Sequence, residues 1–511
     1  MLRVIRIGAS IVLFTLISFY FIDFRGVLPD FFQKLTKIQF IPALSAGGIL
    51  ILGIILSITL LFGRIYCSSI CPMGIFQDIT GWLSKRLRSK KKRKKYTFSP
   101  AKTKLRWGIL VVAIIAYILN GTILFGLIEP YSAYGRMAVH LFKPLYLWGN
   151  NLLAAAFPHI GSVTLYKVDV ILLSVSSLIV ASGTLLIIGF LAWKNGRTFC
   201  NTICPVGTIL GALSKYSFFK IRINTEKCNH CSLCATKCKA SCINSKEQVI
   251  DYSRCVDCFD CLGSCKQGAL SYSFGLNKKK IKDENSVEAG QSRRLFLATA
   301  TTTAIAIPTV FAQNKMNQLS GEKITTRKTP ISPPGAKGAR HLLKHCTSCH
   351  LCISKCPSKV IKPAFLEYGI GGLMQPMMCY ENGFCNYDCT VCADVCPNEA
   401  LHQLSVEKKH RTQIGRVVFV EGLCIVHTEG TNCGACSEHC PTQAVKMERY
   451  KDGLTIPVIN PDICIGCGGC EFICPVRPHR AIFVEGNAIH QEAQVIIEEK
   501  QEDIKVDEFG F

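Results

Sequence analysis

Four long apolar runs occupy the first 200 residues of this 511-residue chain, at about residues 8–22, 43–62, 108–128 and 169–192. Each is near the roughly 20 residues that a helix needs to cross the hydrocarbon core of a bilayer. A shorter apolar piece, residues 144–157, contains Trp148 and two asparagines and favours a surface or re-entrant helix. We therefore predict a membrane domain over residues 1–212 with four spanning helices.

A fifth, weaker apolar segment follows in the middle of the chain. Arg293 and Arg294, in the sequence Ser-Arg-Arg-Leu-Phe-Leu, precede a Thr- and Ala-rich run that ends at Ala312. The pattern resembles a twin-arginine export signal, which carries a domain that has already folded. A plain fifth span or a membrane-associated helix is the alternative. Both the signal and the span place residues 313–511 outside the cytoplasm.

The distribution of charge orients the predicted spans. Residues 64–106, between the second and third spans, carry 13 Lys or Arg against the single acid Asp78. Because cytoplasmic loops are enriched in Lys and Arg, we expect this loop, the N-terminus and the chain after the fourth span in the cytoplasm. The net charge is +24, of which residues 1–312, with 38 basic and 13 acidic residues, hold +25 and residues 313–511 hold −1. A basic run between two spans indicates topology, and we expect no nucleic-acid partner.

The chain contains thirty cysteines, and their spacing indicates that they bind iron-sulfur clusters. Eight of them form two consecutive CxxCxxCxxxC runs in residues 221–275, which is the spacing of a two-cluster ferredoxin. Three thiolates of one run hold a [4Fe-4S] cube, and the fourth belongs to the other cube. We therefore predict one cluster on Cys228, Cys231, Cys234 and Cys265. The other is expected on Cys255, Cys258, Cys261 and Cys238.

Four further runs in residues 341–490 predict four more clusters. The first and the last are complete and precede a proline. They comprise Cys346, Cys349, Cys352 and Cys356, and Cys464, Cys467, Cys470 and Cys474. The middle two runs supply only three close cysteines each, namely Cys389, Cys392 and Cys396, and Cys433, Cys436 and Cys440.

The two incomplete runs each need a cysteine from upstream. Cys424 serves the third run, and either Cys379 or Cys385 serves the second. Cys385 closes the shorter loop and is the predicted ligand, although Cys379 matches the spacing of Cys424. Six clusters then use 24 thiolates, four cysteines lie near the spans, and Cys242 and Cys379 remain. Disulfides or zinc are the alternatives for regular CxxC spacing, but the repeated CxxxCP endings favour iron-sulfur clusters.

One run also contains a CxxCH sequence, which is the signature of covalent haem attachment. It reads Cys346-Thr-Ser-Cys349-His350. The same two cysteines open an intact cluster run that ends in Cys356, and they cannot serve both cofactors. We therefore expect a cluster at this position and no haem.

A twelve-residue motif, GRx[YF]CxxICPxG, ends both the second and the fourth predicted span. It contributes Cys67 and Cys71 in the first copy and Cys200 and Cys204 in the second. Two copies imply two parallel repeats of a two-span unit, with both motifs on the cytoplasmic face. Cysteines four apart share one side of a helical turn, so the pairs could present four thiolates to one metal, with iron or an iron-sulfur centre favoured over zinc. Redox-active dithiols or structural cysteines are the alternatives.

Three polar residues near the predicted spans are further candidates. Glu129 precedes Pro130 at the outer end of the third span, where an acid can take up protons from a quinol or can simply be solvated. His140 and His159 lie in the same outer loop, and a loop histidine is usually only exposed. Glu129 is therefore the predicted quinol-site residue.

These motifs make the chain resemble two known subunits joined together. Residues 1–275, with four spans, two CxxxCP motifs and a trailing ferredoxin, look like the NapH-type membrane subunit of the periplasmic nitrate reductase quinol dehydrogenase. Residues 292–485, with a twin-arginine signal and four cluster motifs, look like its exported NapG-type partner. Lys239 and Lys266 depart from the pattern, because Pro commonly follows the last cysteine of a run, and Cys242 is extra.

The resemblance implies that the chain oxidises menaquinol or ubiquinol in a bacterial inner membrane. It also implies electron transfer to an extracytoplasmic cytochrome or reductase. By likeness to four-cluster ferredoxins, the first and fourth exported runs would exchange Cys356 and Cys474, and the second and third would exchange Cys396 and Cys440. Related architectures serve nitrous-oxide and oxidase-assembly systems, so the resemblance leaves the terminal acceptor and the direction of electron flow open.

The predicted fold is an α-helical membrane domain, with four spans and a signal-like fifth segment, that carries α+β bacterial-ferredoxin-like domains on both sides. Residues 276–312 hold a linker and the signal-like segment, residues 313–340 a second linker and residues 491–511 a tail. A hydrocarbon core of about 30 Å separates the cytoplasmic from the exported clusters. A quinol site, or a metal at the CxxxCP cysteines, must therefore connect them.

The expected function is electron transfer from quinol through six [4Fe-4S] clusters, with the cofactors carrying the redox chemistry. Two alternatives stay open. One is an assembly or redox-maturation factor for a respiratory metalloenzyme. The other is outward electron export from a cytoplasmic redox donor without any quinone.

Overall fold

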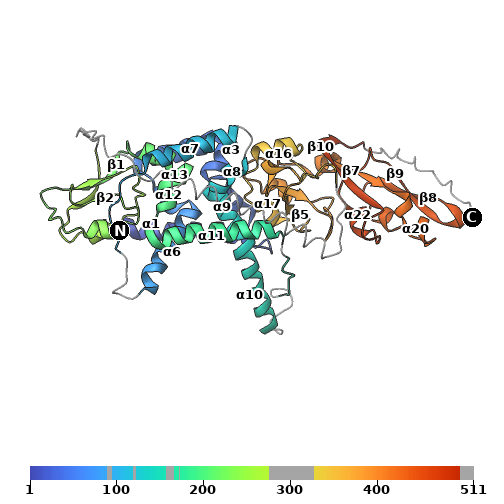
Figure 1. Cartoon of the computed structure of the whole chain (residues 1–511), viewed down its shortest axis with the longest axis horizontal. Helices are drawn as coiled ribbons and strands as arrows, with labels where there is room; N and C mark the ends of the chain where they lie inside the picture. Colours follow the sequence, from blue (N-terminus) through green and yellow to red (C-terminus); the bar gives the residue numbers. More distant parts are fainter. Residues whose placement is uncertain (89–94, 119–121, 157–165, 172, 276–326, 495–511) are drawn as a thin grey trace, which may run out of the picture.

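The computed structural model describes residues 1–511 except 89–94, 119–121, 157–165, 172, 276–326 and 495–511. The molecule is elongated and has three parts along its long axis (Figure 1). A helical block in the middle separates a proximal ferredoxin domain, residues 219–274, from a distal ferredoxin domain, residues 327–494. The predicted twin-arginine segment and His159 lie outside the described residues.

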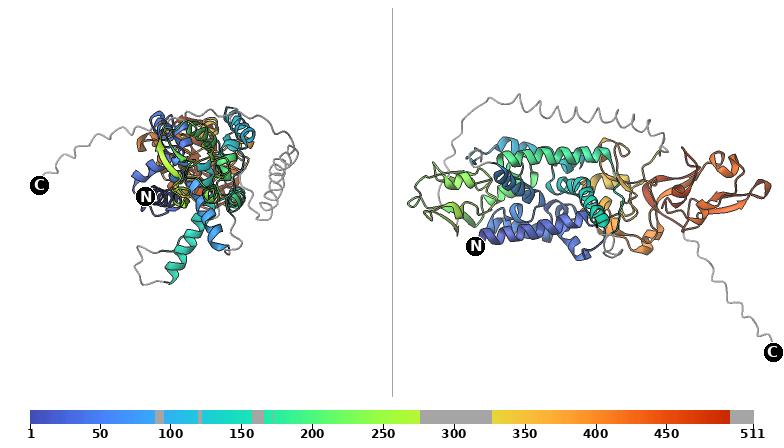
Figure 2. Two further views of the ribbon diagram at one scale, coloured as in Figure 1. Left: turned by 90° about the vertical axis from the view of Figure 1, so that its left-hand side faces the viewer. Right: turned by 90° about the horizontal axis from the view of Figure 1, so that it is seen from below.

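The helical block contains two long helices and many shorter ones. Its elements are α1 (Leu2–Ile22), η1 (Asp30–Gln33), α2 (Lys34–Lys37), α3 (Phe40–Ser45), α4 (Ile49–Phe62), α5 (Ile65–Ser69), α6 (Pro72–Leu87), α7 (Thr103–Ile118), α8 (Thr122–Ile128), α9 (Pro130–Met137), the π-helical turn η3 (Ala138–Phe142), α10 (Lys143–Ala156), α11 (Val175–Asn195), α12 (Thr198–Thr202) and α13 (Pro205–Ser214). The helices α1, α7 and α11 run along the long axis, and α10 projects to the side (Figure 2).

Two of the four predicted spans are single helices of membrane-spanning length. Within the described part of the chain, α1 and α11, each of 21 residues, are the helices long and apolar enough to cross a bilayer. The run at residues 43–62 is divided between α3 and α4, where Gly47 adopts φ +66°. The run at residues 108–128 is divided between α7 and α8. A glycine in the left-handed region ends a helix at no steric cost, which explains the break at Gly47.

The block contains the internal repeat that the sequence predicted. In each copy a long helix, α4 or α11, leads into a one-turn helix, α5 or α12, that holds the first cysteine of the motif. A third helix, α6 or α13, then begins at the proline of the motif. Proline is favoured at the first position of a helix because its missing N–H would have no partner there.

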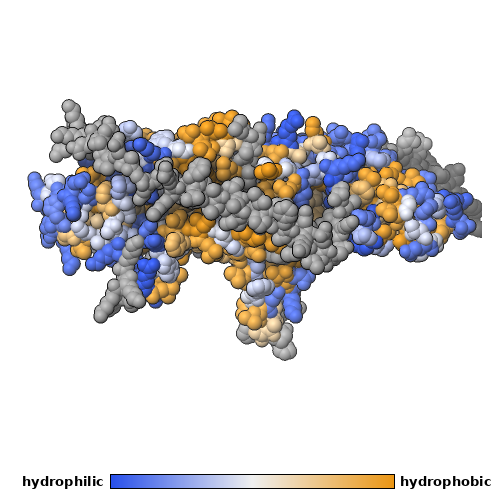
Figure 3. All heavy atoms as spheres, in the orientation of Figure 1, coloured by the Kyte–Doolittle hydropathy of each residue, from blue (hydrophilic) through white to orange (hydrophobic). Residues whose placement is uncertain are grey.

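Large apolar side chains are exposed on the outside of the block. Ile49 is 83% exposed and Leu186 is 70% exposed, and α4, α7 and α11 carry further examples. Figure 3 shows hydrophobic surface over the middle of the molecule, while both ends carry hydrophilic and hydrophobic side chains together. Exposed apolar surface of this extent marks contact with lipid or with another protein.

The proximal ferredoxin domain is built from two small antiparallel sheets. Strand β1 (Phe219–Ile223) pairs with β4 (Leu270–Phe274), and β2 (Ile243–Asn244) pairs with β3 (Val249–Ile250). The helix α14 (Leu233–Lys237) and the turn η4 (Leu262–Ser264) each lie within one cysteine run. The domain thus has two similar halves, one for each run.

The distal ferredoxin domain contains three antiparallel strand pairs. The pairs are β5 (Ile361–Pro363) with β6 (Pro376–Met378), β8 (Val445–Arg449) with β9 (Thr455–Ile459), and β7 (Thr412–Phe419) with β10 (Ile482–Glu492). Its helices are α16 (Ala339–His345), α17 (Leu351–Lys355), η5 (Ile370–Gly372), α18 (Val391–Asp394), α19 (Val406–Arg411), η6 (Glu421–Leu423), α20 (Ile425–Thr428), α21 (Ala435–Glu438), η7 (Lys451–Gly453) and α22 (Gly469–Ile473).

Candidate iron-sulfur sites

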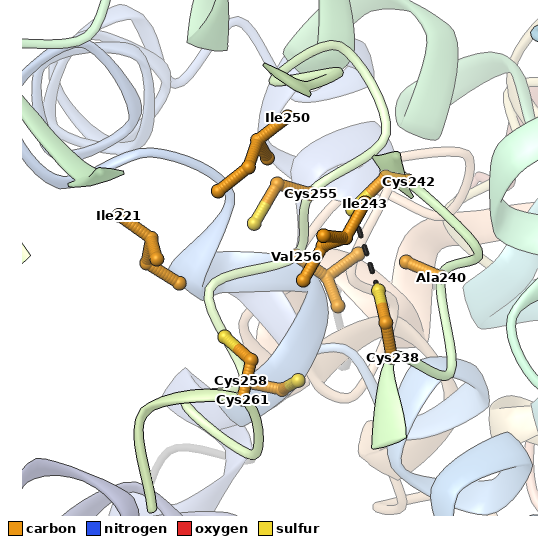
Figure 4. A pocket seen from close by; sticks show the side chains of 10 residues that line it. All are labelled: Ile221, Cys238, Ala240, Cys242, Ile243, Ile250, Cys255, Val256, Cys258 and Cys261. Carbon is orange, nitrogen blue, oxygen red and sulfur yellow. Dashed lines mark hydrogen bonds between the residues drawn. The ribbon is translucent and has the colours of Figure 1, made fainter. Parts of the chain in front are cut away.

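The second cluster site of the proximal domain is a pocket lined by cysteines (Figure 4). It gathers the four residues predicted for this cluster, Cys238, Cys255, Cys258 and Cys261. Cys238 comes from the first run and reaches across the domain to the other three. Cys242 lies in the same pocket, and apolar side chains such as Ile221 and Val256 close it.

The first cluster site of the proximal domain is more open. Cys228, Cys231 and Cys234 lie close enough for their charges to interact. Cys265, the predicted fourth ligand, accepts a hydrogen bond from the backbone N–H of Ala269 at 3.3 Å. Hydrogen bonds to ligand sulfur atoms tune cluster potentials, so this contact suits a ligand. The assignment of Cys265 to this cluster stays a prediction.

The distal domain pairs its cysteine runs in sequence order. One pocket gathers Cys346, Cys349, Cys352 and Cys396. A second gathers Cys356, Cys385, Cys389 and Cys392. A third gathers Cys424, Cys433, Cys436 and Cys474. Cys440 lies with the remaining three, Cys464, Cys467 and Cys470.

The exchange expected between the first and fourth runs, and between the second and third, is therefore wrong. Cys356 and Cys396 cross between the first two runs, and Cys440 and Cys474 cross between the last two. The strand pairs explain the difference. The pair β5–β6 returns the chain from the first run to the second, and β8–β9 returns it from the third to the fourth. Consecutive runs therefore face each other.

The structure separates the two candidate cysteines of the second run. Cys385 lies in the pocket of Cys389 and Cys392, as predicted from the shorter loop. Cys379 is buried beside Lys362 and Glu381, which form an ion pair at 2.5 Å.

The histidine of the CxxCH sequence is fully engaged within the protein. His350 Nδ1 lies 2.7 Å from His140 Nε2, and His350 Nε2 lies 2.9 Å from the carbonyl oxygen of Met374. The ring therefore bridges the distal domain to the helical block. Its two cysteines, Cys346 and Cys349, line the first distal pocket instead.

The chemistry of these donor sets fits clusters better than single ions. Burial raises the pKa of Cys346 and of Cys436 to about 12, so that free thiols would stay protonated there. A coordinating thiol is deprotonated outright by its metal. Across the described residues, no three His, Cys, Asp or Glu side chains are arranged to hold one metal ion. Each of these pockets gathers cysteines in sets of four, which is the ligand set of a [4Fe-4S] cluster.

The four CxxxCP cysteines meet inside the helical block, at its end next to the proximal domain. Each is at most 5% exposed, and their charges interact across the two repeats. Cys67 and Cys200 lie in α5 and α12, whereas Cys71 and Cys204 precede the first residues of α6 and α13 with ψ near 116° and 119°. The predicted helical turn is therefore broken in both copies. A residue before proline avoids helical backbone angles, which explains the break.

Two fully buried arginines brace the repeats against each other. Arg197 Nη1 donates a hydrogen bond to the carbonyl oxygen of Cys67 at 2.7 Å, and Arg64 Nη2 donates to that of Cys200 at 3.3 Å. Each also approaches the thiol of its own repeat, at 3.7 Å for Arg64 and Cys67 and 3.8 Å for Arg197 and Cys200. The arginine of the repeated motif therefore ties one copy to the other.

The last glycine of the motif makes room for these contacts. A Cβ atom on Gly74 would lie 2.2 Å from the carbonyl oxygen of Cys67, and one on Gly207 would lie 2.2 Å from that of Cys200. The backbone N–H of Gly207 also donates to the sulfur of Cys204 at 3.3 Å. A larger residue at either position would force the two helices of a repeat apart.

Polar atoms without partners surround the four thiols. Arg64 Nε, Arg197 Nη2 and Gln77 Oε1 are buried and make no hydrogen bond, while Gln77 Nε2 lies 3.1 Å from Cys200 Sγ. Buried polar groups are nearly always satisfied, so the two free guanidinium N–H groups favour an acceptor between the repeats. The N-termini of α6 and α13 also favour thiolates here. A centre held by four thiolates fits both features, and the iron or iron-sulfur centre expected at these cysteines stays a prediction.

Asp257 connects this site to the proximal cluster pocket. Its carboxylate accepts a hydrogen bond from the backbone N–H of Arg64 at 2.8 Å and lies 3.6 Å from the sulfur of Cys255. Gly63 adopts φ +80° beside it, and a Cβ there would lie 2.2 Å from Asp257 Oδ2. Contacts thus run without a gap from Cys255 through Asp257 and Arg64 to Cys67.

A buried ion network holds the proximal domain on the block. Asp78 binds Arg197 at 2.7 Å, Lys239 at 2.9 Å and Arg6 at 3.1 Å. Burial alone would raise the pKa of Asp78, but Arg197 and Lys239 outweigh it and lower that pKa. The carbonyl oxygen of Lys239 also accepts from the backbone N–H of Arg197 at 2.9 Å. Lys239 therefore replaces the usual proline because it is a docking residue.

We expect Asp78→Asn to destabilise this interface by about 3–5 kcal/mol, because it removes the carboxylate that pairs with the fully buried Arg197. Hydrogen exchange over residues 219–274 should accelerate accordingly. The matched control is Asp462→Asn, which removes a carboxylate 3.9 Å from Arg416 in a half-exposed pair and should change stability by less than about 1 kcal/mol. Equal exchange rates in the two variants would contradict this role of Asp78.

At the other end of the block, Glu129 starts α9. Its carboxylate accepts hydrogen bonds from the backbone N–H groups of Tyr131, at 2.8 Å, and Ser132. The side chain is 1% exposed, so the alternative of a solvated acid is wrong. Both contacts are those of a helix cap. The quinol-proton role of Glu129 stays a prediction.

The first distal pocket lies directly against α9 and η3. Ser132 Oγ hydrogen-bonds to Thr347 Oγ1 at 2.8 Å, and Arg136 Nη1 donates to the carbonyl oxygen of Ser348 at 3.1 Å. His140, expected in an exposed loop, is 4% exposed in the π-helical turn and pairs with His350. That expectation is wrong because the distal domain covers the histidine.

Comparison with known proteins decides the family. A 4Fe-4S binding domain matches residues 44–92 and 174–226, which are the two CxxxCP repeats, and 4Fe-4S dicluster domains match residues 251–360 and 431–477. Ferredoxin-type protein NapF of Escherichia coli K12 is 30% identical over 157 residues, which are 31% of this chain and 87% of NapF. The chain belongs to the Nap-type polyferredoxin family.

Two other relatives of this Nap-type polyferredoxin extend the match. Ferredoxin-type protein NapG of the same organism is 26% identical over 197 residues, which cover 37% of the polyferredoxin and 84% of NapG. The putative electron transport protein YccM is 27% identical over 241 residues, which cover 47% of the polyferredoxin and 58% of YccM. No solved structure matches. The Nap-type polyferredoxin is therefore an iron-sulfur electron-transfer protein with several [4Fe-4S] sites.

Proposed function

We propose that this Nap-type polyferredoxin is a multi-pass membrane protein that oxidises quinol and delivers electrons to an extracytoplasmic cytochrome or reductase. Six [4Fe-4S] clusters would supply one-electron transfer. The four CxxxCP cysteines would hold an additional iron-sulfur centre. The observation that carries the proposal is the presence of cysteine pockets at both ends of a helical block whose outer surface is hydrophobic (Figure 3).

The two ends of the block have different roles in this proposal. At the proximal end, Arg64 and Arg197 hold the four thiolates and balance their charge, and Asp257 joins them to the proximal pocket. At the distal end, Arg136 and the pair of His140 and His350 hold the first distal pocket on α9. Quinol would be oxidised between these ends, since a bilayer core of about 30 Å separates them. Glu129 is the proposed acid beside the quinol.

Topology gives the next prediction. A reporter fused after Gly275 should behave as cytoplasmic, and one at the C-terminus as exported. Residues 64–106 contain 13 basic residues and only one acid, Asp78, and loops rich in Lys and Arg stay in the cytoplasm. Arg293→Lys together with Arg294→Lys should retain the distal domain in the cytoplasm. Unchanged export of the double variant would instead support an ordinary fifth span.

Outward electron export from a cytoplasmic donor is a second candidate, because the contacts from Cys255 to Cys67 join the proximal domain to the block. A redox titration with and without a quinol analogue separates the candidates. Under our proposal the analogue shifts at least one midpoint potential. Identical titration curves would favour the second candidate.

A further inference from the structure

A fifth thiol lies in the second pocket of the proximal domain, beside the four predicted ligands (Figure 4). It belongs to Cys242, whose Sγ lies 3.5 Å from Cys238 Sγ. Cys242 lines the same pocket as Cys255 and is 1% exposed. Its sulfur therefore contacts one predicted ligand from the first run and lies in one pocket with the three predicted ligands from the second run.

The other runs show that this thiol replaces an apolar side chain. Cys242 stands four residues after the last cysteine of its run. The corresponding residues of other runs are Ala269, Val360, Ala400 and Ala444. A cysteine is one of the most buried residue types and can serve as a small apolar residue, as these four do. That role accounts for its burial but not for its contact with the sulfur atom of a predicted cluster ligand, Cys238.

We propose that Cys242 is an alternative fourth ligand of this cluster, interchangeable with Cys238. The inference rests on the proposed cluster in this pocket. In the exchange the iron–sulfur bond to Cys238 breaks and one to Cys242 forms, while the proton of the Cys242 thiol moves to the Cys238 sulfur 3.5 Å away. No electron is gained or lost, and no other reactant is needed.

Cys238 and Cys242 are anchored to different parts of the molecule, so the exchange changes how the cluster is coupled to the helical block. Cys238 precedes Lys239, which binds Asp78 and Arg197 of the block. Cys242 precedes β2, where Ile243 pairs with Ile250 of the same domain. Ligation by Cys238 therefore couples the cluster to docking, whereas ligation by Cys242 holds it within the domain when the docking contacts move.

Iron and sulfide counts on the full chain test the exchange. Cys238→Ala and Cys242→Ala should each keep the wild-type iron and sulfide, whereas the double variant should lose up to about four irons. Cys265→Ala is the matched control, because its run offers Ala269 in place of a spare thiol. It should lose iron, or show the paramagnetic resonance signal of an oxidised three-iron cluster, and Cys238→Ala should not. Cys238→Ser repeats the test if the alanine variant does not accumulate.

Two results would overturn the inference. Iron loss in Cys238→Ala equal to that in Cys265→Ala would leave Cys242 as a buried thiol without a ligand role. Iron loss in Cys242→Ala alone would make Cys242 the resident ligand and exclude exchange. Each variant is compared with the wild-type count, so an absence of iron from the wild-type chain would refute the cluster proposal separately.

Discussion

Serine at Cys71 or at Cys204 is expected to abolish quinol-dependent reduction of the clusters. Both residues lie where α6 and α13 begin, and their thiols face those of Cys67 and Cys200 between the repeats. If these four cysteines hold one centre, loss of either thiolate removes it from the path between quinol and clusters. We expect the rate to fall below detection, measured as the bleaching of cluster absorbance after quinol addition.

Two controls make this result specific. Cys379→Ser changes a buried cysteine that lies in none of the pockets, and it should keep the wild-type rate. Chemical reduction should still give all cube signals in Cys71→Ser and Cys204→Ser, because the cube ligands lie elsewhere. Quinol-driven reduction at the wild-type rate in both variants would reject the relay and leave these cysteines a structural or maturation role.

The second large effect follows from the corrected pairing of the distal runs. A double variant, Cys346→Ala with Cys349→Ala, should lose one cube and about four irons. In that background Cys396→Ala should cost no further iron, because Cys396 lines the same pocket. Cys474→Ala should instead lower the iron count again, since it belongs to the pocket of Cys424 and Cys433.

The opposite result, in which Cys396→Ala lowers the iron count and Cys474→Ala does not, would contradict this pairing. It would support the exchange between the first and fourth runs that four-cluster ferredoxins suggest. The count is informative because substitutions at one cube are not additive, whereas those at separate cubes are. Acid-labile sulfide, measured on the same samples, distinguishes loss of a whole cube from loss of one iron. Folding is monitored by hydrogen exchange of β7 and β10, none of whose residues lines the first pocket.

Local spacing predicted which cysteines share a pocket, because three members of each predicted ligand set are close in sequence. The choice of Cys385 over Cys379 needed only loop length. In the distal domain the partner of each fourth cysteine could not be predicted from spacing, because it depends on which of four runs the strand pairs bring together. Here the pairing of β8 with β9, two strands of five residues, brings the third and fourth runs together, so that Cys440 and Cys474 each lie with the other run.

The helical block was harder to predict from composition alone. Hydropathy located α1 and α11, but it gave no sign that Gly47 divides the second apolar run. The break before Pro72 and Pro205 could have been read from the sequence, since proline disfavours helix at the preceding residue. Glu129 before Pro130 was likewise a readable cap signal.

The residues that join the domains were largely missed. Asp78 stood out as the single acid among 13 basic residues, and the structure explains it through Arg6, Arg197 and Lys239. Asp257 carried no signal, because its partner Arg64 is 193 positions away. Contacts between domains depend on tertiary docking, and a single sequence does not encode them as a local pattern.

Vectorial electron transfer tests the central claim most directly. Membrane vesicles of known sidedness that contain the wild-type chain would receive menaquinol in the bilayer and an impermeant oxidant on the side of the distal domain only. Our account predicts that the oxidant is reduced, and that Cys71→Ser abolishes the reduction. The account would be contradicted if reduction of the oxidant did not depend on quinol and instead required a reduced ferredoxin on the opposite side of the membrane.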